Sequence, residues 1–93
     1  MKVKPITSID TALRIYYAYP EIGNKEIKEL FGVSNTRTLA RYKKDVRQAQ
    51  AERDVLTSQM HTVNTAVAYE VWGIDVADLE KRRDKLRKLG LTA

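Results

Sequence analysis

Three cations, Arg37, Arg41 and Lys44, recur at spacings of four and three residues along one segment of the chain. An α-helix turns by about 100° per residue, so their side chains fall within about 60° of one another on a helix. The apolar residues of the segment fall on the opposite side: Leu39, Tyr42 and Val46. A helix with these two faces buries one side and presents cations on the other. Guanidinium groups can bridge the two acceptors of a guanine in the DNA major groove. This segment is therefore the candidate for contact with DNA.

Caps and helix breakers predict the elements that hold this segment in place. Pro20 ends a first helix, since proline has no N–H and disfavours helix at the preceding residue. Gly32 ends a second helix, because glycine tolerates a left-handed conformation. Asp75 is a cap for a C-terminal helix that Gly90 closes. The predicted helices are Ile9 to Tyr19 (capped by Thr7 or Ser8), Lys25 to Phe31 (capped by Asn24), a third beginning at Asn35 or Thr36 (capped by Ser34 or Asn35), and Val76 to Leu89.

The length of the third helix is open at the level of sequence. No glycine or proline occurs between Gly32 and Gly73, so one helix can run for more than thirty residues. A seven-residue repeat through this stretch is apolar or aromatic at eight of ten positions, as in a coiled-coil seam. A break near Leu56–Ser58 is the alternative, because Thr57, Thr62 and Thr65 are poor helix formers. The ten positions are Leu39, Val46, Arg53, Met60 and Val67, and Tyr42, Ala49, Leu56, Val63 and Glu70.

The stretch from Asn24 to Lys44 resembles a helix-turn-helix. Gly32 permits the reversal of the backbone, Val33 fills the space between the two helices, and Ser34 can cap the helix that follows. Leu39 follows the glycine by seven positions instead of the usual six, which predicts a turn one residue longer than is common. The resemblance covers about half of the chain, 7–48, and is to small helix-turn-helix proteins of phages and bacterial mobile elements. These include compact transcription regulators and the DNA-recognition domains of small terminase subunits, and no motif separates the two groups.

The resemblance implies roles for individual residues. In helix-turn-helix proteins the N-terminal part of the second helix meets base edges, while other residues contact phosphates and set affinity. The predicted base-reading residues are Asn35, Thr36, Arg37, Thr38 and Arg41. The predicted phosphate contacts are Lys25, Lys28, Lys43, Lys44 and Arg47.

Charge and composition support a polyanionic partner and argue against other classes. Residues 1–50 carry ten Lys/Arg and five Asp/Glu, and residues 51–93 carry seven of each, so the whole net charge of +5 belongs to the first half. The chain has no cysteine and one histidine, His61, so we expect no disulfide and no zinc site. We expect no cofactor and no enzymatic activity, because neither a phosphate-binding glycine loop nor a catalytic constellation is evident. No apolar run is long enough for a membrane span and no signal peptide opens the chain, so a cytoplasmic location is expected.

These observations predict an all-α protein with a three-helix helix-turn-helix core, a long third helix that would allow a coiled coil, and a C-terminal helix. With 93 residues it should form one compact unit, with a DNA-binding part (1–48) and a helical oligomerisation part (49–93). We expect a homodimer, because two reading helices add affinity and specificity. Trp72 should also anchor the C-terminal helix against the preceding one. The predicted oligomerisation residues are Leu56, Met60, Val63, Val67, Val71 and Trp72.

The expected function is sequence-specific binding of double-stranded DNA, as a dimeric transcriptional regulator. A DNA-packaging recognition subunit of the small-terminase kind and a helical protein-interaction adaptor are the alternatives. The cationic run Lys81–Arg83 could be a second nucleic-acid site, but interleaved acids favour a solvated helix with ion pairs such as Asp78–Arg82. No internal repeat is evident in the sequence.

Overall fold

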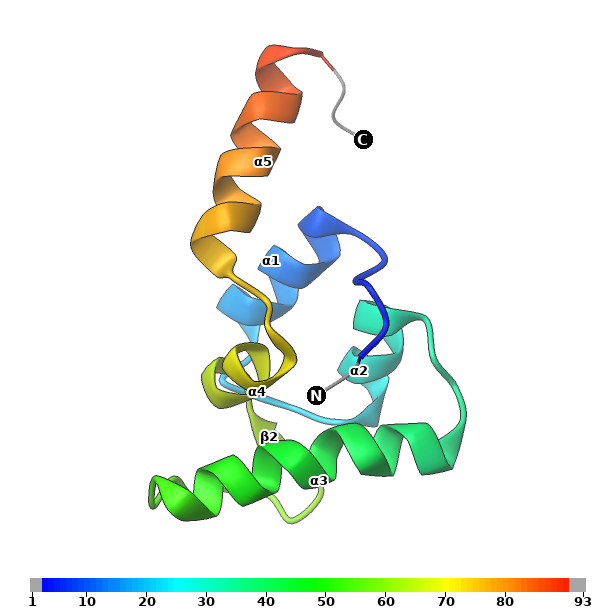
Figure 1. Ribbon diagram of the computed structural model, residues 1–93, viewed down its shortest axis with the longest axis vertical. Coiled ribbons are helices and arrows are strands. Elements are labelled where there is room, and N and C mark those ends of the chain that lie inside the picture. Colours follow the sequence, from blue (N-terminus) through cyan, green and yellow to red (C-terminus); the bar gives the residue numbers. More distant parts are fainter. Residues whose placement is uncertain (1–2, 91–93) are drawn as a thin grey trace.

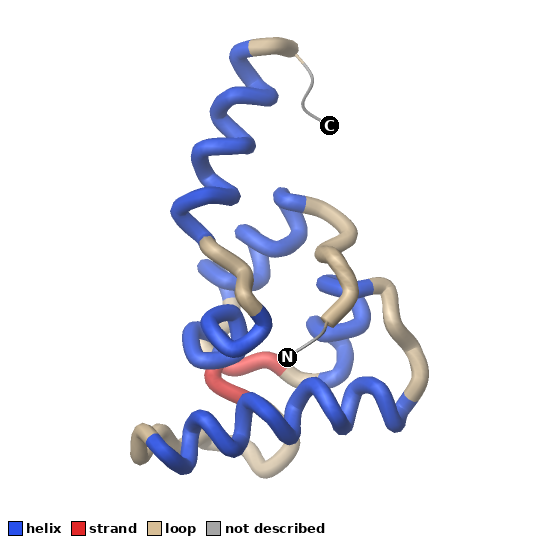
Figure 2. The backbone as a smooth tube through the Cα atoms, in the orientation of Figure 1, coloured by secondary structure: helices blue, strands red, loops and turns tan. Residues whose placement is uncertain are grey.

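A computed structural model describes residues 3–90 and shows a mainly helical protein (Figure 1). Two short strands pair in antiparallel fashion, with Glu21 opposite Asn64 and Ile22 opposite Val63 (Figure 2). No helix within this range is both long and apolar enough to cross a membrane. The elements are α1 (Ile9–Ala18), β1 (Glu21–Ile22), α2 (Asn24–Phe31), α3 (Thr36–Glu52), β2 (Val63–Asn64), α4 (Thr65–Trp72) and α5 (Val76–Lys88).

The predicted cap of the first helix is confirmed, and the predicted cap of the second helix is wrong by one residue. Ser8 caps α1 by accepting a hydrogen bond from the backbone N–H of Thr11, and the helix ends two residues before Pro20. Helix α2 begins at Asn24, one residue earlier than predicted, so the cap is Gly23. The carboxylate of Glu26 accepts the N–H of Gly23 at 2.8 Å, which completes the first turn. Gly32 ends α2 with φ of 66°, the left-handed conformation that its type predicts.

Of the two alternatives for the third helix, the continuous one is wrong, and the chain breaks a few residues before the predicted Leu56–Ser58. Helix α3 ends at Glu52, and Asp54 has a positive φ of 54° that redirects the backbone into a loop, residues 53–62. The chain then returns so that Val63 pairs with Ile22 and α4 lies against α3. This return buries Val63, Val67 and Trp72 in the core, which a continuous helix would leave on its surface. The burial of these side chains outweighs the few additional hydrogen bonds of a longer helix.

Three of the six predicted oligomerisation residues are therefore not on the surface. Val63, Val67 and Trp72 lie inside the single chain, and Val71 is half-buried against the same core. Leu56 and Met60 lie on the loop and are 91% and 84% exposed. The residues of the seven-residue repeat therefore do not form one continuous apolar face, because some are buried in the core and others are exposed on the loop.

An aromatic cluster joins the two parts of the chain in one core. The ring of Phe31 lies edge-on to the rings of both Tyr42 and Trp72, with centroids 5.2 Å apart in each case. The indole of Trp72 donates to the backbone carbonyl of Tyr42 at 3.4 Å. Tyr69 on α4 donates its hydroxyl to the carbonyl of Ala12 on α1 at 2.6 Å. Trp72 thus anchors α4 against α2 and α3, and residues from both predicted parts share one core.

The order of elements repeats, although no repeat was evident in the sequence. We call Glu21–Glu52 the first unit and Val63–Lys88 the second unit. Each has a two-residue strand, an eight-residue helix that ends in an aromatic residue, a left-handed glycine, a side-chain cap and a longer helix. Residues at the same position relative to the short helix of each unit are in contact. Ile22 and Val63 each lie two positions before that helix and pair with each other, and Phe31 and Trp72 each end it and are in contact. Contacts between equivalent residues are what a two-fold relation between two units produces.

Candidate nucleic-acid interface

Helix α3 presents the predicted cations on an exposed face. Arg37, Arg41 and Lys44 are all exposed, and none of them forms an ion pair with another described residue. The opposite face of α3 is buried against β2, α4 and α2 through Leu39, Tyr42 and Val46. The helix that carries the cations is therefore packed against the core along its opposite face. We call Arg37, Arg41 and Lys44 the α3 stripe.

The start of α3 is fixed by Asn35. Its Oδ1 accepts hydrogen bonds from the backbone N–H of Arg37 at 2.9 Å and of Thr38 at 3.2 Å. This oxygen therefore caps the helix, and Asn35 as a whole is exposed. Thr36 is exposed beside Asn35, and Thr38 is half-buried. The turn between α2 and α3 contains four residues, 32–35, which fits the longer turn that the position of Leu39 predicts.

Lys43 is not a surface cation, and its assignment as a phosphate contact is wrong. Its side chain is buried, and Nζ donates to the backbone carbonyl of His61 at 3.4 Å. Burial, together with the charge of Arg47, lowers the pKa of Lys43. On the helical projection Lys43 lies beside Leu39, so the periodicity of α3 already contained this signal.

Arg47 has a structural contact as well as an exposed side chain. Its Nη2 donates to the carbonyl of Met60 at 3.1 Å. With Lys43, it fastens the 53–62 loop along α3. The predicted phosphate contacts of α2, Lys25 and Lys28, are both exposed.

Glu21 is a second anchor of this loop that sequence reasoning missed. Its carboxylate accepts hydrogen bonds from the backbone N–H of Ser58 at 2.8 Å and from the hydroxyl of Thr62 at 2.7 Å. These hydrogen bonds, that from the Ser58 N–H above all, lower the pKa of Glu21. No local pattern around Glu21 marks it, because its partners lie about forty positions away in the chain.

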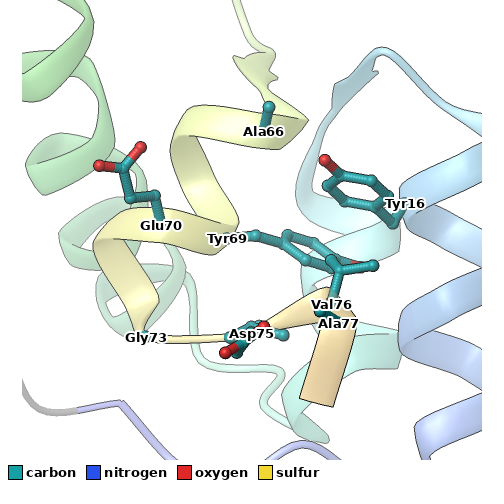
Figure 3. A pocket seen from close by; sticks show the side chains of 9 residues that line it. Tyr16, Ala66, Tyr69, Glu70, Gly73, Asp75, Val76 and Ala77 are labelled. Atoms are coloured by element: carbon teal, nitrogen blue, oxygen red, sulfur yellow. The ribbon is translucent and has the colours of Figure 1, made fainter. Parts of the chain in front are cut away.

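An open hollow beside Gly73 offers no comparable chemistry. Tyr16 of α1 and Tyr69 of α4 stand on its walls, with Glu70 and Asp75 at its edge (Figure 3). The hydroxyl of Tyr69 is already bonded to Ala12, and Glu70 forms an ion pair with Arg53 at 2.7 Å. Asp75 caps α5 by accepting the N–H of Asp78. These three polar groups thus serve the fold, whereas the side chains of the α3 stripe form no hydrogen bond or ion pair among the described residues. The guanidinium of Arg41 lies 5.4 Å from the centre of the Tyr42 ring, on the same helix.

Comparisons with protein-family models, curated proteins and solved structures find no match to this chain.

Proposed function

We propose that the protein binds duplex DNA in a sequence-specific manner, with α2, the Gly32 turn and α3 acting as a helix-turn-helix. One observation carries this proposal: the α3 stripe is exposed and forms no ion pair with a described residue, on a helix whose other face is buried in the core. Such a helix can enter the major groove without unfolding, because nothing on its anchoring face has to move. The concentration of the net charge in residues 1–50 adds long-range attraction to the phosphate backbone.

The proposed roles follow the position of each residue on α3. Arg37 and Arg41 lie in the N-terminal turns, where a recognition helix meets base edges, and each can form a bidentate pair with guanine. Asn35, through its amide nitrogen, and Thr36 and Thr38 supply shorter contacts. Lys44 and Arg47, further along α3, contact phosphates, and Lys25 and Lys28 do so from α2.

Selection of bound sequences from random duplex DNA tests the proposal directly. We expect one preferred sequence, with non-specific binding that weakens steeply as salt rises. Arg37→Ala with Arg41→Ala should abolish the preference and keep part of the non-specific binding. Arg37→Lys with Arg41→Lys is the matched control, because lysine keeps the charge but lacks the planar fork of donors that favours the bidentate pair. This control should lose preference while keeping most of the non-specific affinity.

Two results would contradict the proposal. Absence of any binding to random duplex DNA at low salt would favour a protein-interaction adaptor. Unchanged affinity of the double alanine variant for the selected sequence would remove Arg37 and Arg41 from the interface.

The biological role we propose is transcriptional control through operator binding by a dimer. Two copies on two half-sites, about one helical turn of DNA apart, would give a symmetric selected sequence. Leu56 and Met60 are the members of the predicted interface that remain exposed and can contact a second copy. Sedimentation of the protein with and without the selected duplex measures the number of copies, and a larger ring would favour a packaging role instead.

A further inference from the structure

Helix α5 occupies the place in the second unit that α3 occupies in the first. Both helices follow an eight-residue helix and a left-handed glycine, Gly32 with φ of 66° and Gly73 with φ of 75°. Both begin after a side-chain cap, Asn35 for α3 and Asp75 for α5. The fourth residue of each helix is a buried leucine, Leu39 in α3 and Leu79 in α5. The two helices therefore start in the same way, with the same sequence of local features.

The exposed face of α5 carries cations at the spacing of the α3 stripe. Lys81, Lys85 and Lys88 follow one another by four and three residues and are all exposed. On the helical projection they lie within about 60° of one another, and the buried Leu79 lies on the opposite side. We call these three lysines the α5 stripe.

The acids at the start of α5 are already engaged elsewhere. Asp78 forms an ion pair with Arg82 at 2.9 Å, as the sequence predicts. Glu80 accepts a hydrogen bond from the hydroxyl of Tyr17 on α1. Asp84 is the remaining acid of this helix, and it flanks the α5 stripe. The lysines therefore dominate the outward face of the last turns.

We infer that α5 is a second duplex-binding helix, which contacts the phosphate backbone and does not read bases. Its first turn consists of Val76, Ala77 and Asp78, which offer no side-chain donor to a base edge. Its cations are lysines in the later turns, and a lysine ammonium acts as a point charge that suits phosphates. Binding through α5 is thus independent of sequence and sensitive to salt.

The two stripes bind separate stretches of DNA. Helices α3 and α5 lie at opposite ends of the molecule, whose longest extent is 41 Å (Figure 1). One straight duplex lying in contact with α3 therefore leaves the outer part of α5 free for another segment. The protein would bridge two duplexes, or two segments of one. This inference rests on the proposed function, because bridging requires DNA on α3 as well.

A bridging assay with defined duplexes tests the inference. One duplex is fixed to beads, a second fluorescent duplex is added in solution, and the protein is titrated at low salt. The wild-type protein should retain the fluorescent duplex on the beads. The variant Lys81→Gln/Lys85→Gln/Lys88→Gln should retain at least tenfold less and still bind a single duplex through α3. The control Lys81→Arg/Lys85→Arg/Lys88→Arg should bridge like the wild type, and far-UV circular dichroism of each variant checks that the helices are kept.

A second measurement separates this inference from the proposed function. In a variant with Arg37→Ala, Arg41→Ala and Lys44→Ala, weak binding to random duplex should persist, and adding the three glutamine substitutions should lower the slope of log K against log salt by about 2 to 3. An unchanged slope, or unchanged bridging by the glutamine variant, overturns the role of α5 and leaves the role of α3 standing. Failure of the wild-type protein to bind any duplex overturns both.

Discussion

In both units a short helix, a left-handed glycine and a side-chain cap precede the longer helix, but the two longer helices are packed to different extents. Helix α3 has 17 residues, and five of them are buried, because the chain returns over it through β2 and α4. Helix α5 has 13 residues, of which Leu79 alone is buried, and its packing is against α1. The turn that precedes α3 has four residues, and the turn that precedes α5 has three. These local features therefore determine where the longer helix of each unit starts. The extent of its burial depends on which later segments of the chain pack against it.

The contact between Phe31 and Trp72 should produce the largest effect in the molecule, because it joins the ends of the two short helices. Both side chains are almost fully buried. Phe31→Ala and Trp72→Ala should each lower the free energy of unfolding by about 3–5 kcal/mol. Trp72→Phe, which keeps an aromatic ring, should cost much less. Denaturant titration measures all three, and a double alanine variant with strictly additive losses would deny direct coupling between the units.

The two turn glycines give a matched pair with the next largest effect. Both have positive φ, so alanine at either position should cost about 1–2 kcal/mol for the left-handed backbone. A Cβ on Gly73 meets no atom within 4 Å, whereas a Cβ on Gly32 lies 3.2 Å from the Cγ2 of Thr7. Gly32→Ala should therefore lose more stability than Gly73→Ala in denaturant titration.

Thr7 provides the control for this difference. Thr7→Ser removes Cγ2 and keeps the hydroxyl that donates to the carbonyl of Glu29 at 2.7 Å. In the background of Thr7→Ser, the cost of Gly32→Ala should fall to that of Gly73→Ala. A gap between the two glycines that survives this change would show that the turns differ in the backbone and not in their surroundings.

The two helix caps should contribute similar and smaller amounts. Asn35 accepts two backbone N–H groups and Asp75 accepts one. Asn35→Ala and Asp75→Ala should each lower the free energy of unfolding by about 1 kcal/mol. Asn35→Ser keeps a capping oxygen and should retain most of the stability. A cap whose removal changes nothing would indicate that packing alone starts that helix.

The smallest expected effect is local and depends on pH. The pKa of Glu21 is lowered by hydrogen bonds from Ser58 and Thr62, so the carboxylate form stabilises the folded loop above the ordinary pKa of a glutamate. This stabilisation should be lost as the pH falls through the lowered pKa. Hydrogen exchange at the Ser58 amide should then show less protection in acid than at neutral pH, and Glu21→Gln should show low protection at both. Equal protection of Ser58 in the two proteins at neutral pH would mean that Lys43 and Arg47 hold the loop without Glu21.

Local signals in the sequence determined the starts and ends of most helices. Ser8, Pro20, Gly32, Asn35 and Asp75 act on backbone groups within a few residues of themselves, so their effects do not depend on the rest of the chain. The separation of faces on α3 belongs to the same class, because helical periodicity places Arg37 and Arg41 opposite Val46 whatever the partner of the helix.

Tertiary structure decided where α3 ends, which cations stay in solvent and what the apolar residues after Leu56 do. The sequence of residues 53–64 is compatible both with a continued helix and with a loop followed by a strand. The outcome depended on Val63 reaching Ile22 and on Trp72 reaching Phe31, which lie about forty positions away. The same return of the chain brought the carbonyl of His61 to Lys43 and removed that lysine from the surface. Burial is a property of pairs of distant segments, so a helical projection shows which residues share a face but not which face another part of the chain will cover.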